Sequence, residues 1–183
     1  MTILHIDSSI TGEQSASRTL TRSIVDQLKA SDPAGRVVYR DLAAAPLPHL
    51  TLDAFADTSV LDEFLAADTV VIGAPMYNFT LPTQLKAWID RLAIAGTTFR
   101  YTENGPEGLV KGKRVIIALA RGGFYGEGSP AAALEHLETY LRGVFNFIGV
   151  EPEFVIAEGL NIGPEQREQA INQALGETLR LAA

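Results

Sequence analysis

Three short segments of this chain carry groups suited to binding a small organic ligand. The first, DSSITGEQSASR at residues 7–18, holds five hydroxyl side chains: Ser8, Ser9, Thr11, Ser15 and Ser17. It leads into a helical pattern for which Ser17 is a candidate N-cap. A helix N-terminus offers unpaired N–H groups and a positive dipole end, so hydroxyls beside it predict a phosphate site, to which Arg18 would add charge. The alternative is a serine-rich turn in which Ser17 only caps the helix.

The second and third segments suit a planar ring and a close backbone approach. APMYNF at residues 74–79 follows an apolar run with side chains too large for a tight turn. Aromatic side chains can cover the faces of a planar ring, and backbone groups can bind its heteroatoms, so this segment predicts a ring-binding site. The alternative is that its apolar side chains only close the end of the sheet. ARGG at residues 120–123 places two glycines after a strand. Glycines allow a backbone to approach a ligand closely, and a mobile glycine turn is the alternative.

Short apolar runs alternate with helical patterns along the chain and must position these segments. The runs lie at residues 3–7, 36–41, 69–74, 114–119 and 154–157. The helical patterns lie at 17–30, 60–65, 81–92, 134–148 and from 164 onward. Continuous apolar runs are typical of strands buried on both faces of a parallel sheet. Residues 97–113, with Asn104-Gly105-Pro106 at their centre, are expected to form a hairpin or loop outside this alternation.

The alternation predicts an α/β fold of the flavodoxin-like type. This is a three-layer sandwich with a five-stranded parallel sheet of order 2-1-3-4-5 and helices on both faces. Ligands bind such sheets beyond the carboxyl ends of the strands, where the strand order reverses, here between the first and third strands. All three segments therefore meet at one edge. Together they fit a phosphorylated flavin better than a nucleoside phosphate, because no carboxylate is obviously placed for a ribose.

Composition narrows the class of protein. The chain has 183 residues, of which 46% are hydrophobic and 20% charged, which suits one domain over residues 1–183. A net charge of −7 argues against a nucleic-acid partner or an anionic membrane surface. The chain has no cysteine, and its three histidines lack ligand spacing, so no metal site is expected. With no secretory leader and no apolar stretch approaching about 18 residues, the expected location is the cytoplasm.

Longer strings resemble the FMN-dependent NADH-azoreductase family, also called FMN-dependent NADH:quinone oxidoreductases. The resemblance covers nearly the whole chain and is carried by SSITGEQSASR, APMYNFTLPTQLKAWIDRLAIAGTTFRYTENGPEGLVKGKR and ARGG. It implies a homodimer with one tightly bound FMN per subunit near the dimer interface. It also implies an enzyme that passes two electrons from NADH or NADPH to FMN and then, after the oxidised nucleotide leaves, to a quinone or azo compound. No catalytic side chain is expected, because FMN carries the chemistry.

Matched position by position, the resemblance implies FMN contacts in a phosphate loop, a ring-binding strip and a loop at the polar edge of the ring. These residues are Ser9, Ser15, Ala16 and Ser17; Met76, Tyr77, Asn78 and Phe79; and Ala120, Arg121, Gly122 and Gly123. Family members often have serine at the position of Ala120, so one hydrogen bond is expected to be missing. Aromatic walls for the nicotinamide and the acceptor, or else ordinary packing residues, are expected at Phe99, Tyr101, Phe124 and Tyr125.

Two alternative functions stay open at this point. The first is a flavodoxin-like electron carrier without its own nicotinamide-dependent turnover, and the second is a flavin-binding protein that is not an enzyme. The 97–113 excursion and the modest net charge argue against the carrier. The connection between Leu50 and Asp68 is shorter than we expect for this family, in which it normally shapes the pocket rim and dimer contacts.

Overall fold

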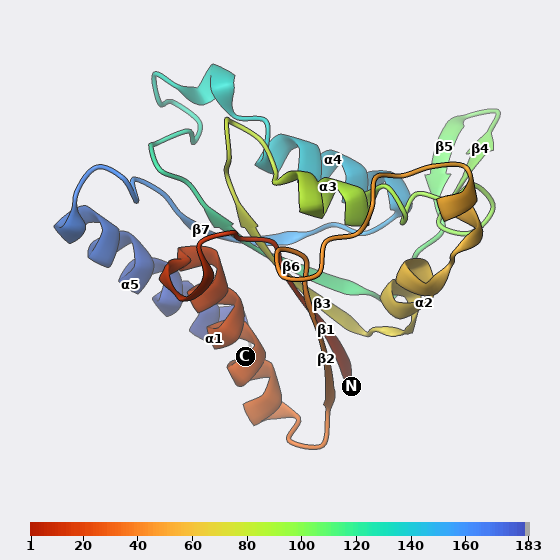
Figure 1. Cartoon of the computed structure of the whole chain (residues 1–183), viewed down its shortest axis with the longest axis horizontal. Helices are drawn as coiled ribbons and strands as arrows, with labels where there is room; N and C mark the ends of the chain where they lie inside the picture. Colours follow the sequence, from red (N-terminus) through yellow and green to blue (C-terminus); the bar gives the residue numbers. More distant parts are fainter. Residues whose placement is uncertain (182–183) are drawn as a thin grey trace.

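A five-stranded parallel sheet forms the centre of the computed structural model, which describes residues 1–181 (Figure 1). Its strands are β1 (Thr2–Asp7), β2 (Arg36–Asp41), β3 (Thr69–Pro75), β6 (Arg114–Ala120) and β7 (Glu153–Ala157). They lie in the order β2-β1-β3-β6-β7. This is the predicted order 2-1-3-4-5 once the two strands of a separate hairpin are left out of the numbering. The predicted topology is therefore confirmed.

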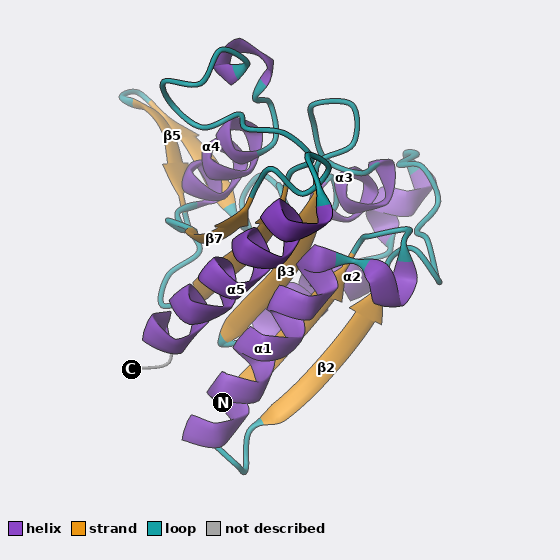
Figure 2. Cartoon of the chain, turned by 90° about the vertical axis from the view of Figure 1, so that its left-hand side faces the viewer, coloured by secondary structure: helices purple, strands orange, loops and turns teal. Residues whose placement is uncertain are grey.

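Helices cover both faces of the sheet, as the two ribbon views show (Figures 1 and 2). On one face α1 (Ala16–Ser31) and α5 (Pro164–Leu181) lie side by side. The other face carries α2 (Ser59–Ala66), α3 (Thr83–Ile89) and α4 (Glu138–Ile148). Each face has its own apolar core, because successive strand residues point to opposite sides. Leu4 belongs to the core beneath α2, α3 and α4, whereas Ile3 belongs to the core beneath α1 and α5.

The excursion predicted at residues 97–113 is an antiparallel hairpin. Its strands are β4 (Phe99–Thr102) and β5 (Gly105–Gly108). Gly108 packs so closely on Gly149 that an added Cβ would lie 2.1 Å from the Gly149 nitrogen, so only glycine fits there. Because Gly149 follows the last turn of α4 and precedes β7, the hairpin lies at the end of the sheet where the strands begin. The predicted ligand edge is the opposite end.

Two helix starts differ from the prediction. Ser17 is not the N-cap of α1: Ser15 is extended (φ −76°, ψ 121°), and its Oγ accepts a hydrogen bond from the N–H of Arg18. The prediction was wrong because neighbouring serines offer equivalent caps, and the backbone conformation decides between them. The second difference is α4, which begins at Glu138 rather than near 134. Leu134 instead ends the 3-10 turn η3 (Ala132–Leu134).

The remaining short elements are the 3-10 turns η1 (Gly12–Gln14) and η2 (Asp53–Ala56). The first belongs to the serine-rich segment and the second to the short connection between Leu50 and Asp68. Within residues 1–181, no helix combines the length and the apolar character needed to cross a bilayer.

Candidate functional site

A cavity of about 680 Å³ lies at the edge of the sheet where β1, β3 and β6 end. All three predicted segments contribute to its wall. The predicted residues that line it are Ser9, Ser15 and Ala16 from the first segment, Met76 and Tyr77 from the second, and Ala120 and Gly122 from the third. The edge of the sheet at which the strand order predicts ligand binding therefore contains a cavity.

One end of the cavity is built from hydroxyl groups and the start of α1. The Oγ atoms of Ser15 and Ser17 are 3.0 Å apart, and both side chains are buried. Ser9 Oγ lies 3.0 Å from Thr11 Oγ1 and 3.3 Å from the Tyr77 hydroxyl. Because α1 directs its unpaired N–H groups toward this end, the geometry suits an anion with several oxygen acceptors, such as a phosphate.

Arg18 does not add free charge to this end, contrary to the prediction. Its guanidinium makes two hydrogen bonds to the Asp41 carboxylate, at 2.7 and 2.9 Å, and lies 3.9 Å from Asp7 Oδ2. The hydrogen bond from Arg18 lowers the pKa of Asp41 below its usual value. A further N–H of Arg18 donates to the Ser9 carbonyl at 2.8 Å. Arg18 therefore fixes the position of the loop, and its charge is already matched by carboxylates.

The second segment ends β3 in a tight turn with unusual backbone angles. Asn78 (φ 46°) and Phe79 (φ 74°) both adopt positive φ, which costs a non-glycine residue on the order of 1 kcal/mol. Two backbone hydrogen bonds between Tyr77 and Thr80 close the turn. Met76 and Tyr77 consequently face the cavity, whereas Phe79 lies beyond it, 41% exposed and edge-on to the Tyr125 ring. Such strain is characteristic of ligand-binding sites.

In the third segment, alternate residues have different surroundings. Ala120 and Gly122 line the cavity. An added Cβ at Gly122 would lie 2.5 Å from the Asn161 amide nitrogen, so this glycine permits a close approach, although to a side chain of the protein itself. Gly123 does not line the cavity, and an added Cβ there would lie 3.3 Å from the Tyr125 ring.

The Arg121 side chain lies among carboxylates rather than in the cavity wall. Its guanidinium is 1% exposed and forms ion pairs with Glu135 (3.2 Å), Glu138 (2.7 Å) and Glu158 (3.4 Å). Burial raises the pKa of Glu135, but hydrogen bonds from the first N–H groups of α4 outweigh this and bring that pKa below its usual value. Arg121 therefore joins the loop after β6 to the start of α4.

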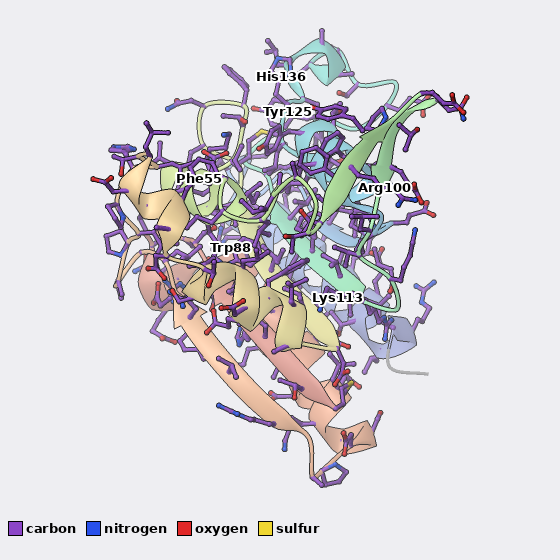
Figure 3. All side chains as sticks on the ribbon, turned by 90° about the vertical axis from the view of Figure 1, so that its right-hand side faces the viewer. Phe55, Trp88, Arg100, Lys113, Tyr125 and His136 are labelled. Atoms are coloured by element: carbon purple, nitrogen blue, oxygen red, sulfur yellow. The ribbon has the colours of Figure 1, made fainter. Side chains whose placement is uncertain are left out.

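The four aromatic residues predicted as substrate walls are not brought together within one subunit. Phe124 packs over Gly159, and Tyr125 contacts Phe79; both lie at the cavity edge of the sheet without lining the cavity. Phe99 and Tyr101 are on the hairpin at the opposite end, where Phe99 packs on Phe147 of α4. Figure 1 shows this separation, with the β4–β5 hairpin at the right and the teal segment that follows β6 at the upper left, and in Figure 3 the hairpin with Arg100 lies toward the viewer.

The region after β7 contributes to the cavity wall, which was not predicted from the sequence. Asn161 in the loop and Arg167 in the first turn of α5 both line the cavity. Arg167 donates a hydrogen bond to the Gln14 carbonyl at 2.7 Å, across 153 residues of sequence. No local motif marks either residue. The available signal was the loop Gly159–Gly163, which follows a predicted strand at the ligand edge.

Known proteins resemble this chain over its full length. Residues 1–181 match a protein family described as having a flavodoxin-like fold. The chain is 56% identical to the FMN-dependent NADH:quinone oxidoreductase of Rhizobium meliloti (strain 1021), with 100% of each covered. It is 54% identical to the protein of that name from Methylorubrum extorquens (strain PA1), again with 100% of each covered. A crystal structure of azoreductase from Bacillus anthracis str. Sterne superposes with a TM-score of 0.91 at 33% identity, covering 100% of this chain and 98% of the other.

Proposed function

This chain belongs to the flavodoxin-like family of FMN-dependent NADH:quinone oxidoreductases, and we propose that it transfers two electrons from NADH, through bound FMN, to quinones or azo compounds. The observation that carries this proposal is the cavity, which combines a hydroxyl-lined helix N-terminus with an adjoining apolar strip at Met76 and Tyr77. An NADPH donor, also expected from the sequence, is the alternative that the experiment below distinguishes.

The residues present fit FMN in size and in chemistry. A volume of about 680 Å³ lies within the usual range for cofactor pockets. The hydroxyls of Ser9 and Ser15 and the start of α1 match a phosphate, and the small side chain of Ala120 leaves room for a flat ring beside Met76. We assign FMN contacts to the twelve residues expected from the sequence. Seven of them line the cavity, whereas Ser17, Asn78, Phe79, Arg121 and Gly123 lie beside it. Only the backbone of Arg121 is available, because its side chain is held by three glutamates.

Bound FMN would supply the hydride and electron chemistry, and this chain supplies position and shielding. The start of α1 with Ser9, Ser15 and Ser17 would hold the phosphate. The strained turn at Asn78 and Phe79 fixes the strip that would cover one ring face and exclude water from it. Phe124 and Tyr125 stay candidate substrate walls, since both lie at the cavity edge. No side chain is required as a proton donor in this scheme.

Anaerobic mixing with a nicotinamide nucleotide tests the proposed function. We expect the purified protein to be yellow, NADH to bleach its flavin absorbance, and benzoquinone or methyl red to restore it. NADPH, tested in parallel, identifies the preferred donor. Protein that holds FMN but is bleached by neither nucleotide would exclude the oxidoreductase, and reduction only by a separate reductase would indicate the electron carrier.

We also propose a homodimer that acts in the cytoplasm on small-molecule acceptors. Large apolar side chains are exposed around the cavity edge: Ile10, Phe79, Phe124 and Leu134. Exposed apolar groups gathered at one edge support an interface there. Light scattering after size-exclusion chromatography should give about twice the chain mass of 19.7 kDa; a mass of one chain would contradict the dimer. The cytoplasmic location is supported by the use of NADH, a nucleotide of that compartment.

A further inference from the structure

Arg167 differs from the other arginines near the serine-rich end of the cavity because no carboxylate neutralises it. Arg18 is committed to Asp41 and Asp7, and Arg22 pairs with Glu13 at 3.2 Å. Among residues 1–181, Arg167 forms no ion pair; the one hydrogen bond of its guanidinium goes from Nη2 to the Gln14 carbonyl, a neutral acceptor. A guanidinium carries five N–H donors. Donors of Arg167 are therefore available to a ligand.

The position of Arg167 places this charge where a phosphate is expected. Gln14, which its guanidinium contacts, directly precedes Ser15, whose hydroxyl stands at the start of α1. Arg167 and Ser15 both line the cavity, although they come from opposite ends of the chain. The guanidinium of α5 and the N–H groups of α1 therefore approach the same end of the cavity from two sides.

The formal charge of the cavity wall makes Arg167 important. Its charged lining residues are Arg167 and Glu13. A phosphate carrying close to two negative charges would face the Glu13 carboxylate, and the partial charge of a helix N-terminus is only about half a unit. Arg167 supplies a full positive charge that is not shared with another acidic side chain.

We propose that Arg167 determines which form of flavin this protein binds, by favouring a flavin that carries a terminal phosphate over one that lacks it. This inference rests on the proposed FMN-dependent function and adds a residue that none of the three predicted segments contains. The hydrogen bond to Gln14 gives Arg167 a second effect, because it ties α5 to η1. A useful test must therefore separate charge at the phosphate from support of the loop.

Affinities of the flavin-free full-length protein for FMN and for riboflavin, measured by fluorescence titration, separate the two effects. Arg167→Gln retains a donor for the Gln14 carbonyl but removes the charge. We expect it to weaken FMN binding roughly fivefold to twentyfold, with riboflavin binding changed by less than about twofold. Arg167→Lys, which keeps the charge, should retain most of the preference for FMN. Arg180→Gln is the matched control, because Arg180 is an exposed arginine in the last turn of the same helix and does not line the cavity.

Equal weakening of FMN and riboflavin by Arg167→Gln would show that Arg167 only supports the loop, and would overturn the inference. An unchanged FMN affinity would overturn it as well. Arg167→Met, which keeps the aliphatic stem without the charge, serves as a second neutral variant should Arg167→Gln fold poorly. Wild-type protein that binds neither flavin would instead contradict the proposed function. Failure of the inference and failure of the proposed function therefore give different results.

Discussion

Replacing Ser15 by aspartate is expected to abolish FMN binding at micromolar concentrations while leaving the fold intact. Ser15 caps α1 and lines the cavity, so a carboxylate there would face the flavin phosphate. Like charges a few ångströms apart in a partly buried site repel by about 3 kcal/mol or more, equivalent to at least about a hundredfold in affinity. Aspartate is itself a good N-cap, and negative charge near a helix N-terminus is favourable. The flavin-free protein should therefore be as stable as the wild type.

The matched control is Ser15→Asn, which keeps a capping side chain of the same size as aspartate but adds no charge. Fluorescence titration with FMN gives the affinity, and thermal unfolding of the flavin-free protein gives the stability. We expect the asparagine variant to lose about tenfold or less in affinity. If aspartate and asparagine weaken FMN binding equally, the site at the start of α1 does not hold the phosphate.

Replacing Arg121 by methionine is expected to lower the free energy of unfolding by about 3 kcal/mol. The methionine would leave Glu135, Glu138 and Glu158 near one another without the buried cation that now contacts all three. Removing one partner from a buried ion cluster is costly because the remaining charges lose their compensation. These carboxylates are partly hydrated, which keeps the expected loss at the lower end of the usual range. Urea unfolding of the flavin-free protein measures it.

Arg142→Met provides the comparison for this variant. Arg142 also pairs with Glu138, at 2.8 Å, but its side chain is 44% exposed and lies one helical turn along α4. Exposed pairs of this kind contribute about 0.3–0.5 kcal/mol. Similar losses in the two variants would mean that burial of Arg121 gives it no special role. A larger loss of unfolding free energy for Arg121→Met would show that the ion pairs of Arg121 hold the loop after β6 in place.

The part of the site that follows from sheet topology could be predicted from the sequence. Continuous apolar runs gave the five strands, and their order identified the edge where Ser15, Met76 and Gly122 meet. The positions of the strand ends can be predicted because few strand orders and connections are possible for a parallel sheet. The hairpin could also be predicted, but from a local pattern, since Asn104-Gly105 is a strong turn signal.

Side-chain direction and long-range pairing could not be predicted. Arg121 lies between two cavity-lining residues in the sequence, and the carboxylates of Glu135, Glu138 and Glu158 draw its side chain away from the cavity. Arg18 was expected to face a phosphate. Its partner Asp41 lies at the end of β2, 23 residues further along the chain, and comes close to Arg18 only in the folded protein. Arg167 was missed for a related reason: it reaches the cavity from the last helix, and no local pattern marks it.

The turn at Asn78 and Phe79 determines when the ring-binding strip loses its conformational freedom. Both backbone hydrogen bonds that close this turn have their donor and their acceptor within the chain, so the turn needs no group of the cofactor to hold its shape. Ordering a residue costs about 1–2 kcal/mol of backbone entropy, a cost that a flexible strip would impose on each binding event. Part of the affinity for the cofactor is therefore drawn from the folding stability of the protein.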